Sequence, residues 1–224
     1  MAYSAGFTPH PRVSYANAAP TGTGSEAEFL EIALTEARDP GPLRAMLDAS
    51  MPDGLDITEA VVAHTPGLAE RLTASVWEMR LDGVTVGDAR RAVSAFLDAE
   101  SVEVRRRGKN GLRTLDARAA VAGLEAYDPQ PDRSEGGPCA ILRLVVRHVT
   151  PAVRPDDVLS GLRAVADLEP PVPVAVTRLA QGLFDEESGT VTDPLAPDRE
   201  AASAVLSTAG KAAVATAPAG AGSA

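Results

Sequence analysis

The residues of this sequence that could do chemistry lie in two short segments, and the more strongly charged one is in the middle of the chain. Residues 101–118 carry a local charge of +4 in a chain whose net charge is −10. Cationic side chains at the tip of a hairpin can bind the phosphate groups of a nucleic acid. The segment therefore predicts an RNA- or anion-binding surface formed by Arg105, Arg106, Arg107, Lys109, Arg113 and Arg118.

A second interpretation of this basic segment stays open. Strand alternation places Arg105 and Arg107 on one face and Arg106 on the other, so a flat basic patch does not follow. No aromatic residue lies within residues 101–118, which argues against the stacking that reads single-stranded bases. Charges on an edge hairpin also protect it from aggregation.

The other segment is a stiff stretch near the N-terminus. Two prolines flank a histidine, and each X-Pro bond favours an extended backbone. Such a loop could present His10 and Arg12 outward, or it could be a rigid turn in which His10 caps backbone groups. The candidate residues here are Gly6, Phe7, Pro9, His10, Pro11 and Arg12.

Other kinds of chemistry find little support in the sequence. None of the histidines at positions 10, 64 and 148 has a ligand partner at the spacing of a metal site, and His148 is expected to be a hydrogen-bonded residue at a strand end. The single cysteine, Cys139, excludes an internal disulfide and fits a core or edge position better than a nucleophile. No glycine-rich phosphate loop or nucleophile elbow is present. The sequence therefore predicts no catalytic residue, no metal ligand and no cofactor.

Composition and hydrophobic periodicity predict a folded α+β protein. The chain is 45% apolar and 23% charged, and no apolar run is long enough to cross a membrane. No secretory signal is visible, so the expected location is the cytoplasm. The net charge of −10 makes the chain as a whole a poor binder of polyanions.

Elements of period 2 and period 3.6 alternate along the chain. Between residues 70 and 179 their order is β-α-β-β-β-α-β, which is ferredoxin-like apart from one extra strand. The order over residues 1–62 is β-β-α-β, the same unit without its first strand and helix. We expect an incomplete ferredoxin-like half (1–66), a second ferredoxin-like domain with a basic hairpin (67–194) and a disordered Ala/Gly/Pro-rich tail (195–224).

Local signals give the expected element boundaries. Helices are predicted to begin after Asp39, after Thr85 and at Pro155, where capping residues or prolines precede an apolar stripe. The remaining expected elements are strands around residues 1–17, 28–34, 55–62, 70–81, 102–107, from 112 onward, 139–149 and 172–179.

Residues 2–16, with the run Tyr-Ser-Ala-Gly-Phe-Thr-Pro-His-Pro-Arg, resemble the signature of the radical-SAM-linked protein family. This family is a bacterial domain of unknown function found beside or fused to radical SAM proteins. Weaker similarity at residues 111–118, 139–162 and 174–182 extends the resemblance over residues 1–194 and adds Asp116 to the motif candidates. The actinobacterial branch is the most similar, and its genes tend to lie near an E/G-type ribonuclease.

The resemblance implies a non-catalytic accessory of a radical SAM enzyme, acting in RNA metabolism. A radical SAM cluster needs three cysteines and this chain has one, so it would be the partner and not the catalyst. The family pattern also continues upstream with an Arg-rich strand and a basic helix that this chain is expected to lack, which would leave side chains such as Leu30, Ile32 and Ile57 exposed.

Two other functions remain open at the level of sequence. One is a protein-interaction module that docks a radical SAM protein or an E/G-type ribonuclease. The other is an enzyme whose site lies around His10, Arg12, Asp116 and Arg118. The expected partners are therefore a radical SAM protein and either RNA or the ribonuclease, with no membrane.

Overall fold

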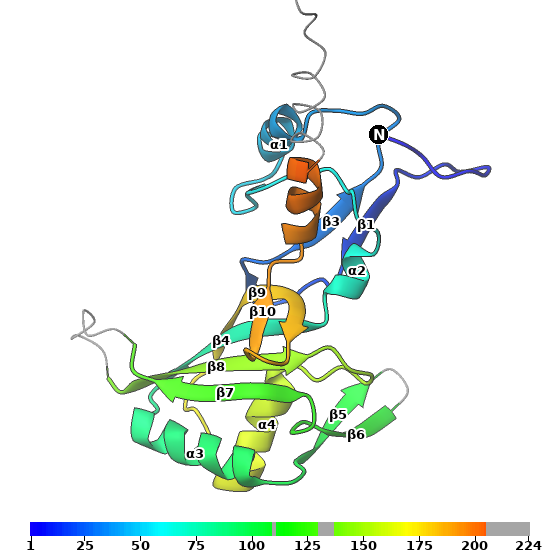
Figure 1. Ribbon diagram of the computed structural model, residues 1–224. Coiled ribbons are helices and arrows are strands. Elements are labelled where there is room, and N and C mark those ends of the chain that lie inside the picture. Colours follow the sequence, from blue (N-terminus) through cyan, green and yellow to red (C-terminus); the bar gives the residue numbers. More distant parts are fainter. Residues whose placement is uncertain (109–110, 130–136, 205–224) are drawn as a thin grey trace, which may run out of the picture. The chain divides into compact units, whose positions relative to one another are not determined.

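The computed structural model describes residues 1–108, 111–129 and 137–204 and mixes helices with sheets, which confirms the α+β class (Figure 1). The chain forms two compact units. Among the described residues, unit 1 comprises residues 1–14, 30–68 and 194–204, and unit 2 comprises residues 15–29 and 69–193. The domain limits expected from the sequence stay a prediction.

Unit 2 is built on an antiparallel sheet whose central strands run in the order β9-β4-β8-β7. Two short strands add to β9: β10 pairs with it antiparallel and β2 pairs with it in parallel. The strands are β2 (Gly24–Ser25), β4 (Ala74–Asp82), β7 (Val121–Tyr127), β8 (Cys139–Arg147), β9 (Ala175–Asp185) and β10 (Thr190–Thr192).

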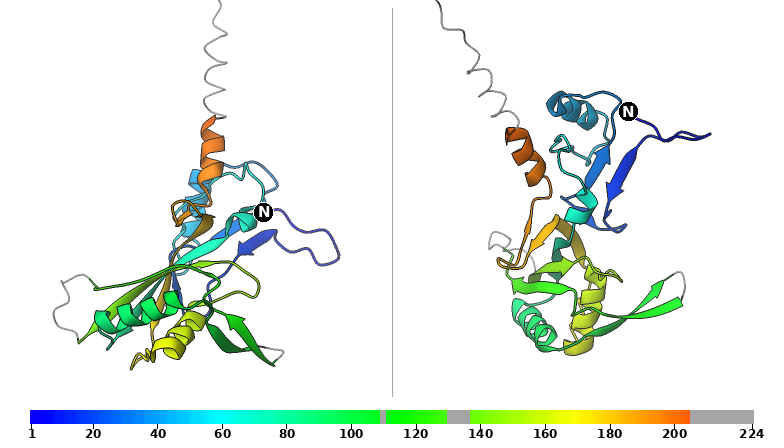
Figure 2. Two further views of the ribbon diagram at one scale, coloured as in Figure 1. Left: turned by 60° about the horizontal axis from the view of Figure 1, so that its bottom comes forward. Right: turned by 45° about the vertical axis from the view of Figure 1, so that its right-hand side comes forward.

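Helices α3 (Val86–Asp98) and α4 (Pro155–Ala166) cover the same face of this sheet (Figures 1 and 2), as their apolar stripes predict. Thr85 caps α3, since its Oγ1 accepts a hydrogen bond from Asp88 N at 3.1 Å. At Gly161 of α4, an added Cβ would lie 2.7 Å from the ring of Phe96, so only glycine allows the two helices to approach this closely. The core lies between the helices and the sheet.

Strands β5 (Glu103–Gly108) and β6 (Gly111–Asp116) form a separate two-stranded sheet in unit 2, inserted between α3 and β7. The cross-strand neighbours Val104 and Leu115 are buried in the core and hold the base of this hairpin. Figure 2 shows its far end projecting from the body of unit 2. The predicted hairpin is therefore confirmed, while Lys109 and Asn110 of its turn lie outside the described residues.

The shorter elements of the molecule include β1 (Val13–Ala16) and β3 (Phe29–Ile32), which pair in a two-stranded sheet. Each of these strands contains a point where the chain passes between the units. Asp39 caps α1 (Pro40–Asp48), as predicted, by accepting a hydrogen bond from Gly41 N at 2.9 Å. A short helix, α2 (Leu68–Arg71), lies where the chain leaves unit 1 for unit 2.

The strand expected over residues 55–62 does not form. Side chains of α1 bind the backbone of Ile57 instead: Asp48 Oδ1 accepts from its N–H at 2.8 Å, and Arg44 Nη1 donates to its carbonyl at 2.7 Å. Because both backbone groups of Ile57 are used in this way, they are not available to a sheet ladder. Leu30 is exposed as expected, whereas Ile32 and Ile57 are half-buried.

The described beginning of the tail also differs from the expectation of disorder, because residues 196–204 are helical. Within unit 1, Asp198 is buried and its Oδ1 accepts hydrogen bonds from the backbone N–H groups of His64 and Thr65, at 2.9 and 2.7 Å. Arg199 forms an ion pair with Glu59. These polar contacts hold in place a segment whose composition alone predicts disorder. Residues 205–224 lie outside the described part of the chain.

Candidate functional site

The two faces of the β5–β6 hairpin carry different sets of arginines. Arg106 lies opposite Arg113 in the ladder, and both share the face of the buried pair Val104 and Leu115. Arg105 and Arg107 lie on the other face, as alternation predicts. The basic residues of the hairpin therefore point to both sides of a thin ribbon.

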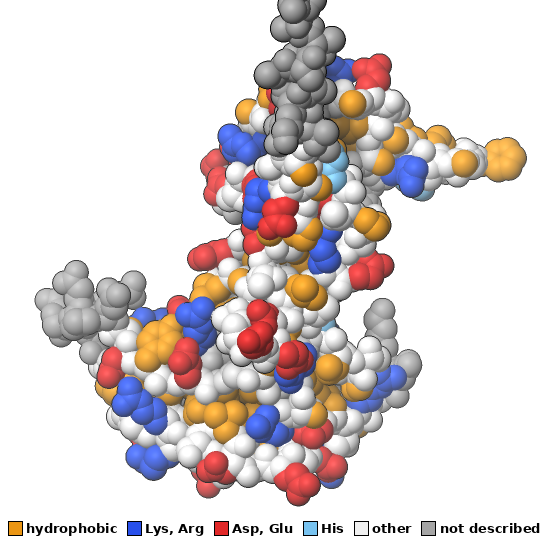
Figure 3. All heavy atoms as spheres, viewed as in Figure 1, with side chains coloured by type: hydrophobic (Ala, Val, Ile, Leu, Met, Phe, Trp, Pro, Cys, Tyr) orange, Lys and Arg blue, Asp and Glu red, His pale blue; other side chains and the backbone are white. Residues whose placement is uncertain are grey.

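Three hairpin arginines are exposed: Arg105, Arg107 and Arg113. None of them forms an ion pair with any residue of the described ranges. We refer to these three residues as the free arginines. Figure 3 shows basic side chains (blue) beside the end of the hairpin. Their guanidinium groups are available to phosphate, and Lys109 lies outside the described residues.

Arg106 has a different environment from the free arginines. Its guanidinium forms an ion pair with Asp157 of α4, whose relative exposure is 4%, and also donates to the carbonyl of Ala152 at 3.1 Å. Asp157 in turn accepts from Arg154 N at 2.8 Å, which caps the first turn of α4. Arg106 therefore connects the hairpin to α4.

Arg118 and Asp116 are also engaged internally. The Arg118 guanidinium donates to the carbonyls of Leu97, at the end of α3, and of Val121. Asp116 Oδ1 accepts from Val102 N and Arg118 N, each at 2.9 Å. Burial alone would raise the pKa of Asp116, but these backbone hydrogen bonds outweigh it and the pKa lies below its usual value. Both side chains hold the backbone around the base of the hairpin.

The N-terminal candidates form a narrow loop in unit 1. Tyr3 and Pro11 form an isolated antiparallel bridge, and Ser4 N donates to the His10 carbonyl at 2.9 Å. His10 N donates to Ser4 Oγ at 3.0 Å, so the backbone of His10 closes the loop while its side chain is exposed. The motif residues Gly6, Phe7, Pro9, His10, Pro11 and Arg12 are all exposed.

The four residues considered for an enzyme site do not belong to one unit. His10 and Arg12 lie in unit 1, and Asp116 and Arg118 lie in unit 2. Since Asp116 and Arg118 use their polar atoms on the local backbone, their geometry is that of structural residues.

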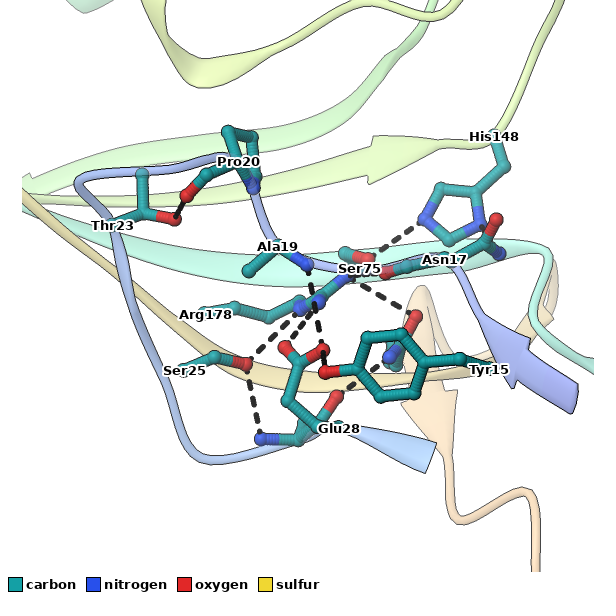
Figure 4. Close-up of polar contacts among 12 residues, drawn as sticks. Tyr15, Asn17, Ala19, Pro20, Thr23, Ser25, Glu28, Ser75, His148 and Arg178 are labelled. Carbon is teal, nitrogen blue, oxygen red and sulfur yellow. Dashed lines mark hydrogen bonds and ion pairs between the residues drawn. The ribbon is translucent and has the colours of Figure 1, made fainter. Parts of the chain in front are cut away.

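Unit 2 contains a buried polar cluster that the sequence reasoning missed (Figure 4). Its centre is Arg178 of β9, with a relative exposure of 2%. The guanidinium forms an ion pair with Glu28 and lies over the Trp77 ring, 5.2 Å from its centroid. Further hydrogen bonds run to the carbonyl of Asn17 at 2.7 Å and to Ser25 Oγ at 3.3 Å.

Residues 17–28 are held against β9 by this cluster. Besides the bonds of Arg178, the buried Gln181 donates to the Ala27 carbonyl at 2.6 Å, and Tyr15 OH donates to Glu28 Oε2 at 2.6 Å. The sequence did carry a signal, because Arg178 continues the alternation of Val174 and Val176 on the strand predicted over residues 172–179. An arginine at such a position requires polar partners, but nothing local says where they lie.

Contacts within the cluster shift the pKa values of Glu28 and Tyr15. Burial alone would raise the pKa of Glu28, but hydrogen bonds from Ser25, Tyr15 and Arg178 together lower it. The same hydrogen bond to Glu28 raises the pKa of Tyr15. The carboxylate therefore stays charged beside the guanidinium while the phenol stays neutral.

His148 and Ser75 form a contact at the edge of this cluster. The imidazole Nε2 lies 2.7 Å from Ser75 Oγ, and Nδ1 lies 2.7 Å from the Leu72 carbonyl. Nδ1 therefore carries the proton, and Nε2 accepts from the hydroxyl. Burial lowers the pKa of His148, and the positive charge of Arg178 also lowers it. The hydrogen bond to the Leu72 carbonyl acts in the opposite direction but does not outweigh them. Ser75 has a relative exposure of 1%, and its hydrogen bond to His148 joins β4 to the residue that follows β8.

The described residues show neither a group of three or more His, Cys, Asp or Glu side chains that could hold a metal ion nor a helix long and apolar enough to cross a membrane.

Comparison with known families finds a match to a family that is conserved in bacteria. A family model described as "Uncharacterized protein conserved in bacteria (DUF2344)" matches residues 1–155. The chain belongs to this family. The DUF2344 match includes the N-terminal loop and the whole basic hairpin and ends at Pro155, the first residue of α4. Neither a curated protein nor a solved structure matches the chain.

Proposed function

We propose that this DUF2344 protein is a non-catalytic accessory protein that binds RNA through the β5–β6 hairpin. The observation that carries the proposal is the state of the free arginines, which are exposed and have no ion-pair partner among the residues the structure describes. Exposed arginines without an ion-pair partner can bind phosphate groups, and the described residues of this one hairpin include three of them.

The attachment of the hairpin supports this role. Arg106, Val104 and Leu115 fix its base to α4 and to the core, so the free arginines are presented from an ordered support. Because these arginines lie on both faces of the ribbon, the contact with RNA runs along the phosphate backbone and does not require one flat surface.

The partner enzyme is the second part of the proposal. It rests on the resemblance of residues 2–16 to the radical-SAM-linked family, and the same resemblance suggests the actinobacterial branch and an E/G-type ribonuclease nearby. A chain with one cysteine would leave the radical chemistry to its partner.

We also propose that unit 2 is a ferredoxin-like domain that carries the hairpin as an insertion. The order β4-α3-β7-β8-α4-β9 and the sheet order β9-β4-β8-β7 support this assignment. In the first half of the chain, the loss of the expected strand at residues 55–62 leaves no comparable support.

The RNA part of the proposal is tested by binding to a fluorescent single-stranded 20-mer at low salt, followed by anisotropy. Replacing Arg105, Arg107 and Arg113 together with alanine is expected to weaken binding about tenfold or more, because three phosphate contacts are lost. The matched control replaces Arg91, Arg143 and Arg163, three exposed arginines of unit 2 outside the hairpin, with alanine and is expected to bind as the unchanged protein does.

Two results would contradict the proposal. Equal RNA binding by the hairpin variant would remove the hairpin from the binding surface. Absence of RNA binding together with salt-insensitive co-purification of a protein partner would favour the alternative, a protein-interaction module that docks a radical SAM protein or an E/G-type ribonuclease.

A further inference from the structure

The N-terminal loop of unit 1 presents one aromatic side chain fully to solvent. Phe7 has a relative exposure of 110%, the highest of any large hydrophobic residue in the described part of the chain. Figure 3 shows hydrophobic atoms (orange) at the far end of this loop. A phenylalanine ring left in water forgoes about 2–3 kcal/mol of burial, which a ligand that covers the ring could recover.

The loop is held in shape independently of Phe7. The bridge between Tyr3 and Pro11 and the two hydrogen bonds between Ser4 and His10 close its stem. The stem is joined to Ala33, because Ala2 N donates to the Ala33 carbonyl at 2.7 Å and Ala33 N donates to that of Arg12 at 2.9 Å. A ring on a closed loop of this kind loses little conformational freedom when it binds.

The sequence of the segment that carries Phe7 favours a polyanion with flat, stackable groups. Residues 1–25 contain no acidic residue, although the chain has 31, and they include Arg12 and His10. Tyr3, on the stem of the same loop, is also exposed, at 58%. Exposed aromatic side chains and an arginine in one acid-free segment are a combination with which proteins can stack unpaired nucleobases.

We propose that Phe7 stacks on an unpaired base of single-stranded RNA, with Arg12 near the backbone phosphates. This inference rests on the proposed function and adds to it a preference for single strands. The hairpin supplies salt-dependent phosphate contacts, whereas the loop supplies a contact with bases that salt affects little. A ring that instead filled an apolar protein pocket would not require an acid-free segment around it.

The test compares RNA binding by the full chain and by its Phe7→Ala and Phe7→Leu variants. Both are expected to bind a single-stranded 20-mer on the order of tenfold more weakly, with an unchanged salt slope and unchanged binding to duplex RNA. The fold should be unaffected, since the Phe7 ring is fully exposed. Met46→Ala removes another exposed apolar side chain of unit 1 and is expected to change nothing.

A second measurement reports on stacking directly. In a Phe7→Trp variant, the new indole is exposed, whereas the native Trp77 is buried. The single-stranded 20-mer should quench the exposed fluorophore, and an abasic strand of the same length should not. The unchanged protein should likewise prefer the normal strand to the abasic strand about tenfold, a preference that Phe7→Ala removes.

The outcomes separate this inference from the function on which it rests. If Phe7→Ala binds single strands as tightly as the unchanged protein does, the stacking role is wrong and the hairpin proposal stands. If Phe7→Leu binds single strands as tightly as the unchanged protein does, while Phe7→Ala does not, the ring is an apolar anchor and not a stacking group. This result also overturns the inference. If the unchanged protein binds no RNA at low salt, the proposed function fails and the inference fails with it.

Discussion

Arginines of unit 2 occupy two opposite environments, and the comparison shows what decides the role of this residue type. Arg178 is buried, and its guanidinium is used on Glu28, Asn17, Ser25, Gln181 and the Trp77 ring. The free arginines are exposed and have no such partners among the described residues. The first environment holds a segment of the chain in place, and the second leaves cations available for a ligand.

The largest expected effect comes from breaking the buried side of this comparison. Arg178→Met should lower the free energy of unfolding by about 3–5 kcal/mol, because it leaves the Glu28 carboxylate without its ion-pair partner. The measurement is the urea unfolding curve. Arg143→Ala, at an exposed position of β8, serves as the control and should stay within about 0.5 kcal/mol. A loss below about 1 kcal/mol for Arg178→Met would mean that the cluster does not hold residues 17–28 in place.

An intermediate effect is expected at Arg106, which lies on the hairpin but has a buried partner. Arg106→Ala should cost about 1–3 kcal/mol of unfolding free energy, because Asp157 loses its charged hydrogen-bond donor. Its neighbour Arg105 serves as the matched control, and Arg105→Ala should stay within about 0.5 kcal/mol. Equal stability of the two variants would contradict the division of the hairpin into a supporting arginine and free arginines.

The pH dependence of stability gives a further test of the buried cluster, through the carboxylate of Glu28. Its pKa in the folded protein lies below the ordinary value of 4.5. The charged carboxylate therefore stabilises the fold above that value, and this contribution is lost as the pH falls through the folded-state pKa. Between pH 6 and 3, the unfolding free energy of the Glu28→Gln variant should fall less steeply than that of the unchanged protein. Parallel curves would show that Glu28 does not contribute to the acid sensitivity.

The fold was predictable where the signals are local. The caps at Asp39 and Thr85 mark the starts of α1 and α3 correctly. The Asn-Gly pair at residues 110–111 predicts the hairpin, and strand alternation predicts the faces of its arginines. The expected strand at residues 55–62 was wrong because the backbone of Ile57 is bound by side chains of α1, which periodicity does not reveal.

The candidate sites were predictable to different degrees for the same reason. Composition alone pointed to the basic hairpin, but only the structure separates Arg106 and Arg118 from the free arginines, because their partners are distant or are backbone carbonyls. The cluster of Arg178 was missed because its partners Asn17 and Glu28 lie at the other end of the sequence. Alternation places Arg178 on the face of Val174 and Val176, but it does not identify the partners of the guanidinium.

The most direct test of the account is the salt dependence of RNA binding by the unchanged protein and by the variant with alanine at Arg105, Arg107 and Arg113. The plot of log affinity against log salt concentration should become shallower by about 2–3 units in this variant, since each phosphate contact contributes about 0.7–0.9. The control variant at Arg91, Arg143 and Arg163 should keep the original slope. An unchanged slope in the hairpin variant would contradict the claim that the free arginines bind RNA phosphates.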